Sequence, residues 1–275
     1  MQSHTRDINN IRMTWSEQGE GFPVVLVHGI PTSPALWRHV VPLLQGARCV
    51  AWEMVGYGTS RLQGRGRDIS VAKQAEYLAA FLDAMGISGA VFAGHDLGGG
   101  VVQILAVQRP ELCAGLMLTN AIGYDSWPIP SVKALRSVSG LVRRLPAPAL
   151  EPVLMMMMLR GHDTSAQAKE AMRTHWPLYA SRFGPDAFAR QVASLNVQDT
   201  IAVSPRLRQL AVPARIVWGE ADQFQKIEYG ERFARDLAAP LCRIPGGKHF
   251  TPEDHPEVVA RAIGELVVEA SSNSI

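Results

Sequence analysis

The chain has 275 residues, of which 47% are hydrophobic and 19% are charged, and its formal net charge at pH 7 is +2. This composition excludes a disordered chain or a fibre, and the near-neutral charge gives no electrostatic argument for a nucleic-acid or membrane partner. A compact fold of this length buries about three quarters of its extended surface, which is enough for one large core without disulfides or metals.

Three cysteines are present, and none has the spacing of a metal site. Cys49 and Cys242 each lie in an apolar run, so we expect buried, unpaired thiols, as in a reducing compartment. The N-terminus is polar, and the longest apolar run, residues 153–159, is too short for a membrane span. We therefore expect a cytoplasmic protein with no membrane partner.

Strand and helix patterns alternate along most of the chain. The pattern predicts strands over residues 24–27, 49–52, 90–93, 116–119, 215–218 and 241–244. Helices are predicted over 36–44, 69–85, the segment through 107, 229–237 and 257–269, and the tail 271–274 is expected to fray.

This alternation predicts an α/β fold with a mostly parallel central sheet flanked by helices. The strand rhythm disappears between Tyr124 and Pro205, where prolines and four consecutive methionines (155–158) accompany helical pieces. We interpret residues 124–205 as an inserted helical cap, and residues 1–123 with 206–275 as the core domain. The methionines are expected to pack inside the cap, or alternatively to form a plastic wall that accepts bulky substrates.

The most informative motif is Gly94-His95-Asp96-Leu97-Gly98, which follows a strand and precedes a helix. Small residues on either side permit a tight strand-to-helix turn that lifts the central side chain onto the sheet edge, as in a nucleophile elbow. A carboxylate at this position is a competent nucleophile at saturated carbon that carries a leaving group, and the product is an alkyl ester on the enzyme. Alone, the motif is equally typical of a turn with a capping aspartate.

Three further loops follow predicted strands. His28-Gly29-Ile30-Pro31 follows the first, and in this architecture the backbone N–H groups of Ile30 and Leu97 would form an oxyanion hole. His249, in a glycine-containing loop, would be the general base. Asp222 would orient it, with Glu220 as the rival acid. The order nucleophile, acid, histidine is the order expected of this fold.

These motifs resemble α/β-hydrolases of the haloalkane dehalogenase and epoxide hydrolase group over nearly the whole chain. The stretch His28-Gly29-Ile30-Pro31-Thr32-Ser33-Pro34-Ala35-Leu36-Trp37-Arg38 is especially similar to haloalkane dehalogenases, and Gly-His-Asp at the elbow is similar to both groups. The resemblance implies that Asp96 displaces the leaving group. His249 then activates water to hydrolyse the ester, while Ile30 and Leu97 hold the oxyanion.

The sequence departs from both groups at the leaving-group site. Haloalkane dehalogenases typically carry a halide-binding tryptophan after the nucleophile and often an asparagine after His-Gly, where this chain has Leu97 and Ile30. Epoxide hydrolases use cap tyrosines, and commonly also a tryptophan after the nucleophile. The candidate leaving-group donors here are Tyr124, Trp127, His175, Trp176 and Tyr179, each of which is alternatively a packing residue.

On these grounds epoxide opening is the first expectation and dehalogenation the second. An ester hydrolase, a lyase or a ligand sensor on the same fold stay as further alternatives. No cofactor is expected, because the sequence has no dinucleotide fingerprint, phosphate loop or clustered metal ligands. The expected partners are a small apolar organic substrate and water, and the oligomeric state is left open.

Overall fold

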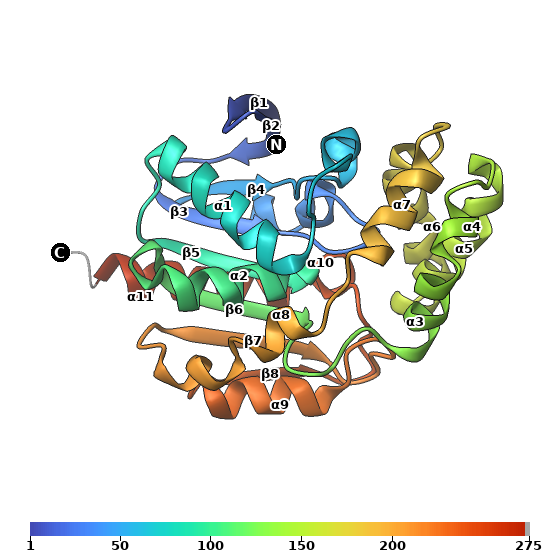
Figure 1. Ribbon diagram of the computed structural model, residues 1–275. Helices are drawn as coiled ribbons and strands as arrows, with labels where there is room; N and C mark the ends of the chain where they lie inside the picture. Colours follow the sequence, from blue (N-terminus) through green and yellow to red (C-terminus); the bar gives the residue numbers. More distant parts are fainter. Residues whose placement is uncertain (273–275) are drawn as a thin grey trace.

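The computed structural model describes residues 1–272, and its centre is one eight-stranded sheet (Figure 1). The strands lie in the order β1-β2-β4-β3-β5-β6-β7-β8. β2 pairs antiparallel with β1 and β4, and all other neighbours are parallel. The strands are β1 (Gln2–Ile8), β2 (Ile11–Gln18), β3 (Phe22–Val27), β4 (Ala47–Trp52), β5 (Ala90–Asp96), β6 (Cys113–Ala121), β7 (Ala214–Gly219) and β8 (Leu241–Ile244).

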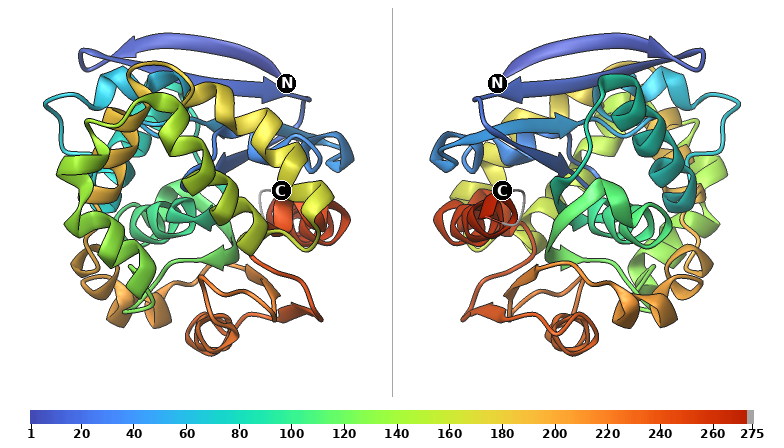
Figure 2. Two further views of the ribbon diagram at one scale, coloured as in Figure 1. Left: turned by 90° about the vertical axis from the view of Figure 1, so that its right-hand side faces the viewer. Right: turned by 90° about the vertical axis from the view of Figure 1, so that its left-hand side faces the viewer.

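Helices cover both faces of the sheet and its carboxyl edge (Figures 1 and 2). The α-helices are α1 (Val71–Met85), α2 (Leu97–Gln108), α3 (Pro130–Ser137), α4 (Ser139–Val142), α5 (Ala147–Gly161), α6 (Ser165–His175), α7 (Gly184–Ala193), α8 (Gln198–Ile201), α9 (Ile227–Asp236), α10 (Thr251–Asp254) and α11 (Pro256–Ser272). Short 3-10 helices are η1 (Pro34–Trp37), η2 (Val41–Leu43), η3 (Gly58–Gly64), η4 (Pro110–Leu112), η5 (Trp176–Leu178) and η6 (Ser204–Gln209).

The central strands are apolar on both sides because both faces are covered. On β3, Val25 and Val27 belong to the core cluster that includes residues of α1 and α2, whereas Val24 and Leu26 belong to the cluster that includes α11. Figure 1 shows α1 and α2 in front of the sheet and α11 behind it. The predicted α/β fold with a mostly parallel sheet is therefore confirmed.

Two local predictions need correction. Residues 36–44 do not form one helix; two 3-10 turns, η1 and η2, stand there, each with a proline in its first turn. The hairpin β1–β2 was not predicted, because β1 is a mostly exposed and polar edge strand. The sequence of its partner β2 does indicate a strand, because the apolar residues Ile11, Met13 and Trp15 stand at alternate positions and are buried.

The exposure of Cys49 and Cys242 depends on where their strands lie in the sheet. Cys49 on β4 is buried and unpaired, as expected. Cys242 is also unpaired but is exposed, which corrects the prediction of a buried thiol. The reason is that β8 is the last strand of the sheet, and its middle residues face solvent. The predicted tail extends partly into α11, which continues to Ser272, and its remaining residues lie outside the described part of the chain.

The segment between β6 and β7 contains α3 to α8 and lies over the carboxyl ends of the parallel strands (Figure 1). The left view of Figure 2 looks onto these helices. The expected boundaries fall in the loop after β6 and inside η6, and the division into two domains stays a prediction. Within residues 1–272, no helix combines the length and apolar character needed to cross a bilayer.

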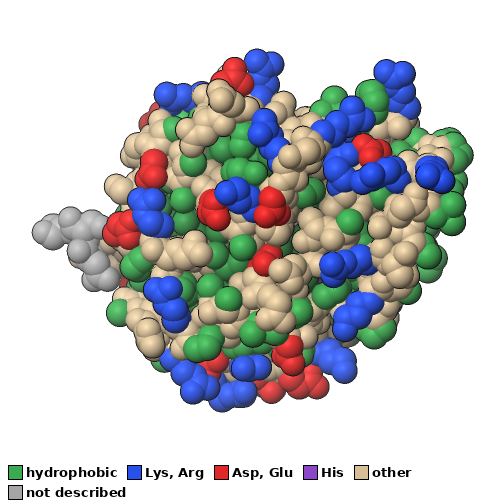
Figure 3. Space-filling view, viewed as in Figure 1, with side chains coloured by type: hydrophobic (Ala, Val, Ile, Leu, Met, Phe, Trp, Pro, Cys, Tyr) green, Lys and Arg blue, Asp and Glu red, His purple; other side chains and the backbone are tan. Residues whose placement is uncertain are grey.

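An ion-pair cluster joins this helical segment to the rest of the molecule. Asp186 on α7 pairs with Arg190 on the same helix, with Arg143 after α4, and with Arg65 after η3. Figure 3 shows basic side chains gathered on this part of the surface. The cluster connects α7 to the loop that follows η3.

Candidate active site

Asp96 lies at the turn between β5 and α2, in a backbone conformation that few side chains adopt. Its φ is 50° and its ψ is −121°, which is a strained region for a residue other than glycine. The turn requires Gly98, because a Cβ at that position would lie 2.1 Å from the carbonyl oxygen of Val27. The side chain of Asp96 is thereby held at the carboxyl edge of the sheet.

The loop after β3 approaches Asp96 closely. A Cβ on Gly29 would lie 2.3 Å from Asp96 Oδ2, so only glycine fits there. The backbone N–H of Ile30 donates a hydrogen bond of 2.9 Å to that oxygen. One carboxylate oxygen of Asp96 is therefore already held by a backbone donor.

Competing effects act on the ionisation of Asp96. Burial raises its pKa, whereas the positive charge available on His249 and hydrogen bonds from the backbone of Ile30 and Leu97 lower it. Burial prevails, so the pKa of Asp96 lies above its ordinary value. The carboxylate is poorly solvated, and poor solvation makes an anion a stronger nucleophile.

His249 lies between β8 and α10 and forms a pair with Asp222 from the loop after β7. Its Nδ1 is 2.8 Å from Asp222 Oδ2, and both side chains are buried. Glu220, the rival acid, is instead paired with Arg243 on the surface. The backbone N–H groups of His249 and Phe250 donate to the carbonyl oxygen of Gly161, the last residue of α5, at 2.9 and 3.1 Å.

Asn120, at the end of β6, supports Asp222. Its Nδ2 donates a 2.7 Å hydrogen bond to Asp222 Oδ2, and its Oδ1 accepts from the backbone N–H of Gly219 and from the hydroxyl of Thr251. Asp222 Oδ1 also accepts from the backbone N–H of Phe224 at 2.6 Å. The sequence places Asn120 directly after the predicted strand 116–119, a position that favours Asp222 as the acid but does not reveal this contact.

The electrostatic surroundings of His249 favour its charged form. Burial lowers its pKa, but the charge and hydrogen bond of Asp222 and the charge of Asp96 raise it more. The pKa of His249 is therefore above the ordinary 6.5. With Nδ1 bonded to Asp222, the other ring nitrogen, Nε2, is left for a ligand or water.

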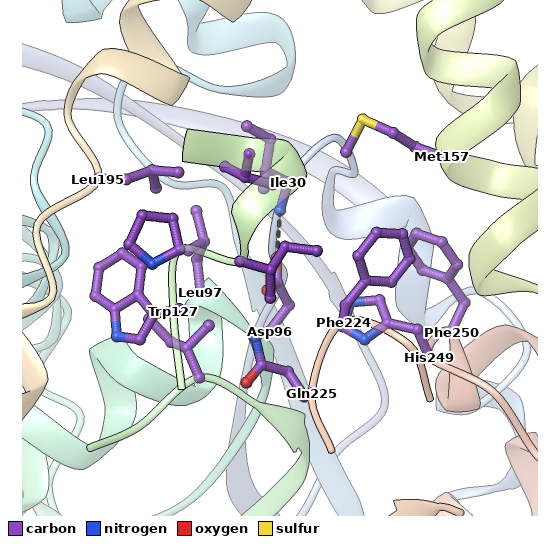
Figure 4. A pocket seen from close by; sticks show the side chains of 14 residues that line it. Ile30, Asp96, Leu97, Trp127, Met157, Leu195, Phe224, Gln225, His249 and Phe250 are labelled. Carbon is purple, nitrogen blue, oxygen red and sulfur yellow. Dashed lines mark hydrogen bonds between the residues drawn. The ribbon is translucent and has the colours of Figure 1, made fainter. Parts of the chain in front are cut away.

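A small cavity separates these groups from the helical segment (Figure 4). It offers about 50 Å³ of space for the centres of water-sized atoms. Its lining is mostly apolar and consists of Ile30, Asp96, Leu97, Ile122, Trp127, Pro128, Ile129, Val132, Met157, Leu195, Phe224, Gln225, His249 and Phe250. Asp96 and His249 thus face one mostly apolar space, whereas Asp222 does not line it.

The cavity adjoins an apolar groove between α3 and α5. Val132, Met157 and Phe224 line both the cavity and the groove, which continues past Leu135 and Met156. Of the four consecutive methionines, Met157 lines the cavity and the other three do not. The cavity and the groove thus share a wall formed by these three side chains.

Four of the five expected leaving-group donors do not line this cavity. The hydroxyl of Tyr124 donates to Asp236, and the hydroxyl of Tyr179 donates to Gln191. His175 Nε2 lies 3.1 Å from a carboxylate oxygen of Glu253, and Trp176 lies in η5 outside the lining. Tyr124, Tyr179 and His175 are thus bonded to other side chains, which the local pattern could not reveal.

Trp127 does line the cavity, but its ring nitrogen does not serve it. The indole N–H donates a 2.7 Å hydrogen bond to the hydroxyl of Thr200. The expectation of an indole donor is therefore corrected: Trp127 contributes an apolar wall.

Gln225 is the polar lining residue that sequence reasoning missed. It follows Asp222 by three positions, and its side chain is buried beside Asp96 (Figure 4). Its position in the loop after a strand was the only available signal, and that signal does not separate it from its neighbours.

Comparison with known proteins agrees with this architecture. The family model for the alpha/beta hydrolase fold matches residues 23–256. Haloalkane dehalogenase 2 of Mycobacterium tuberculosis is 28% identical, over 96% of this chain and 94% of its own. A 2-hydroxymuconate semialdehyde hydrolase of Pseudomonas putida is 25% identical, over 95% and 92%. An alpha/beta hydrolase fold protein from Burkholderia ambifaria superposes with a TM-score of 0.89 at 27% identity, over 95% of this chain and 97% of that one.

The matched family model covers most of the chain, and the relatives align along nearly their whole lengths. The chain therefore belongs to the α/β-hydrolase fold family, as a hydrolase that resembles haloalkane dehalogenases.

Proposed function

We propose that the protein hydrolyses a carbon–halogen bond in a small apolar molecule through a covalent alkyl ester on Asp96. The observation that carries this proposal is the arrangement of the Asp96 carboxylate. Oδ2 accepts the backbone N–H of Ile30, and the same side chain lines an apolar cavity together with His249. This arrangement leaves Oδ1 as the attacking atom.

In the first step, Asp96 Oδ1 attacks the carbon that carries the halogen. The new oxygen–carbon bond forms as the carbon–halogen bond breaks, and the halide leaves with the bonding electron pair. Oδ2 becomes the carbonyl oxygen of the ester while it remains near the N–H of Ile30. The donor for the second step is thus in place before the ester exists.

In the second step, His249 removes a proton from water, and the resulting hydroxide attacks Cγ of Asp96. The negative charge that develops on Oδ2 is stabilised by the Ile30 N–H. Collapse breaks the Cγ–Oδ1 bond, and His249 returns its proton to the departing alkoxide. The products are an alcohol, a halide and one proton, and one oxygen of Asp96 now comes from water.

The cavity favours a halide over an epoxide as the leaving group. Epoxide opening creates an alkoxide that needs a proton, and tyrosine is the side chain expected to supply it. No tyrosine is among the lining residues, and the hydroxyls of Tyr124 and Tyr179 are bonded elsewhere. We therefore place dehalogenation first and epoxide opening second. The resemblance to haloalkane dehalogenase 2 supports this order.

The space in the cavity points to short substrates. The cavity is small, with about 50 Å³ of space for atom centres, so we expect a haloalkane of a few carbons. Bromobutane is a suitable probe, because bromide leaves readily and the chain is apolar.

The test uses a His249→Gln variant, in which the ester forms but is not hydrolysed. We expect incubation with bromobutane to add one butyl group to the peptide that contains Asp96, as measured by mass spectrometry. An Asp96→Asn, His249→Gln double variant is the matched control and should gain no mass. In the unmodified protein, one turnover in water labelled with heavy oxygen should place the label in Asp96.

Three results would count against the proposal. Alcohol formation by the unmodified protein without any adduct in His249→Gln would point to direct hydrolysis. An adduct with epoxybutane but not with bromobutane would restore epoxide opening to first place. Reversible binding with no adduct and no turnover would indicate a ligand sensor.

A further inference from the structure

We infer that the side-chain amide of Gln225 is the hydrogen-bond donor that receives the leaving halide. This inference rests on the proposed function and identifies the group that recognises the leaving atom. It starts from the lining of the cavity, where Ile30 and Leu97 stand with Asp96 and offer no side-chain N–H.

The amide of Gln225 is buried without a partner. The residue is 3% exposed, and its Oε1 is fully buried with no hydrogen bond. Within residues 1–272, the hydrogen bond that Gln225 makes is through its backbone carbonyl, so both amide atoms are uncommitted. A halide accepts hydrogen bonds, so it would pair with the Nε2 N–H of this amide and not with Oε1.

The backbone around Gln225 is firmly held. Its carbonyl oxygen accepts a 2.9 Å hydrogen bond from the indole N–H of Trp218, which is completely buried at the end of β7. The preceding residue, Phe224, donates its backbone N–H to Asp222. The side chain is therefore presented to the cavity from a fixed base, and Figure 4 shows it beside Asp96.

The other donors around the cavity are already in use. The indole N–H of Trp127 is bonded to Thr200, and the backbone N–H of Ile30 is bonded to Asp96. His249 is bonded to Asp222 through Nδ1, and its free nitrogen must be unprotonated to act as a base. Among the side chains that line the cavity, the amide of Gln225 is thus the uncommitted N–H donor.

An amide N–H suits a halide in particular. It donates a hydrogen bond to a departing anion but is far too weak an acid to transfer a proton to an alkoxide. The halide departs with the bonding electron pair and needs no proton. The same residue would therefore assist loss of bromide or chloride and would not assist opening of an epoxide.

One donor stabilises the departing charge less than two would. The rate of ester formation should then depend strongly on how well the halide leaves by itself. We expect bromobutane to alkylate Asp96 faster than chlorobutane, and we expect loss of the Gln225 donor to widen that ratio, because chloride needs more stabilisation.

The experiment measures the rate of alkylation of Asp96 in the His249→Gln background with chlorobutane and bromobutane. Gln225→Met keeps the volume and removes the donor, and should slow alkylation on the order of a hundredfold with chlorobutane and less with bromobutane. Gln225→Glu keeps the shape, adds a negative charge, and should slow both. Gln223→Met is the matched control in the same loop, because the Gln223 amide bonds Arg160 outside the cavity, and it should leave both rates unchanged.

The outcomes separate this inference from the proposed function. If the His249→Gln parent forms no adduct with either halide, the proposed function fails. If the parent is alkylated and Gln225→Met, shown to be folded by its thermal unfolding, is alkylated at the same rates and ratio, the assignment of Gln225 is overturned while the function stands. Slower ester hydrolysis in a Gln225→Met protein that retains His249, with unchanged alkylation, would likewise overturn it in favour of a role in holding water.

Discussion

Asp96 and Asp222 act on one imidazole from two sides. Asp222 is hydrogen-bonded to His249 Nδ1, and Asp96 faces His249 across the cavity. Both carboxylates raise the pKa of His249 against the lowering effect of burial, with Asp222 the stronger. In the proposed mechanism Asp96 loses its charge when it becomes an ester, and the pKa of His249 would then fall as this residue is needed as a base.

We predict that neutralising either carboxylate lowers the pKa of His249. Asp96→Asn should lower it, and Asp222→Asn should lower it further, because Asp222 contributes both charge and a hydrogen bond. The measurement is an NMR titration of the His249 ring. Glu220→Gln is the control, since Glu220 is paired with Arg243, and it should not change the titration. An unchanged pKa in both variants would refute the coupling.

Asn120 offers a stability prediction. Asn120→Leu removes the acceptor of the Gly219 N–H and a donor to Asp222, both buried, and should lower the free energy of unfolding by about 1–3 kcal/mol. Urea unfolding measures the change. Gln209→Leu, at an exposed amide side chain, should change it by less than about 0.5 kcal/mol. Equal effects in the two variants would contradict the role assigned to Asn120.

The residues that the sequence could reveal are those with a local signature. Asp96 stands in a strand–turn–helix motif whose glycines are needed by the backbone. Asp222 and His249 follow strands in the expected order, and the structure brings them to hydrogen-bond distance. Gln225 and Asn120 have no such signature, because an amide acquires its role only from the groups that the fold places around it.

At the scale of elements, a buried ionic cluster links α10 to the ends of α5, α6 and η1. Glu253 on α10 contacts His175 at the end of α6, His162 just after α5, and Arg38 just after η1. His162 also lies 2.7 Å from Asp254. The cluster ties the helices above the cavity to the segment that follows the His249 loop.

Glu253→Gln tests the importance of this cluster. The substitution keeps the shape but removes the charge that faces two histidines and an arginine, and breaking a buried pair of this kind costs about 3 kcal/mol. We expect a corresponding loss in the free energy of unfolding, measured in urea, and faster proteolysis within residues 124–205. Glu257→Gln, on exposed α11 surface, is the control. Wild-type values for Glu253→Gln would show that the contacts carry little energy.

The elements themselves were predictable where a strand is buried on both faces. β3, β5 and β7 have continuous apolar runs, because helices cover both sides of them. β1 escaped prediction because an edge strand exposed to water keeps its polar residues. The residues around η1 and η2 have helical spacing, but their prolines favour short turns, so spacing alone misled.

At the scale of the whole molecule, acid should destabilise the fold through buried groups. His28 is completely buried; its Nδ1 donates to the carbonyl of Gly29 and its Nε2 accepts from the backbone of Met54, which is the neutral form. Burial lowers the pKa of His28 to about 3. Glu253 is an acid, and its pKa is also lowered. Burial raises it, but His175, Arg38 and His162 outweigh burial and bring it to about 2.

Both lowered pKa values make the folded protein less stable as the pH falls. Between pH 6.5 and about 3 the unfolded chain binds a proton at His28 that the folded chain does not, and from pH 4.5 to about 2 the same holds for Glu253. We predict that the free energy of unfolding falls as the pH is lowered from 6.5, by at most about 1.4 kcal/mol per pH unit for each group. Urea unfolding across this range measures the slope, and His28→Gln should flatten it above pH 4.5. An equal slope in that variant would exclude His28 as a source.

Long-range contacts also explain why the expected leaving-group donors do not serve the cavity. Tyr124, Tyr179 and His175 were plausible from their position in the helical segment, but each is bonded to a partner that only the folded chain brings near. Sequence position indicates which region faces the cavity, whereas the direction of each side chain is settled by packing. The class of chemistry was therefore more accessible from the sequence than the recognition of the leaving group.

The carbonyl oxygen of Gly161 connects the helical segment to the loop of His249. It joins the end of α5 to the backbone of both His249 and Phe250. A movement of α5 away from the core would break both hydrogen bonds and displace the backbone of His249. The position of the proposed base is therefore coupled to the position of α5.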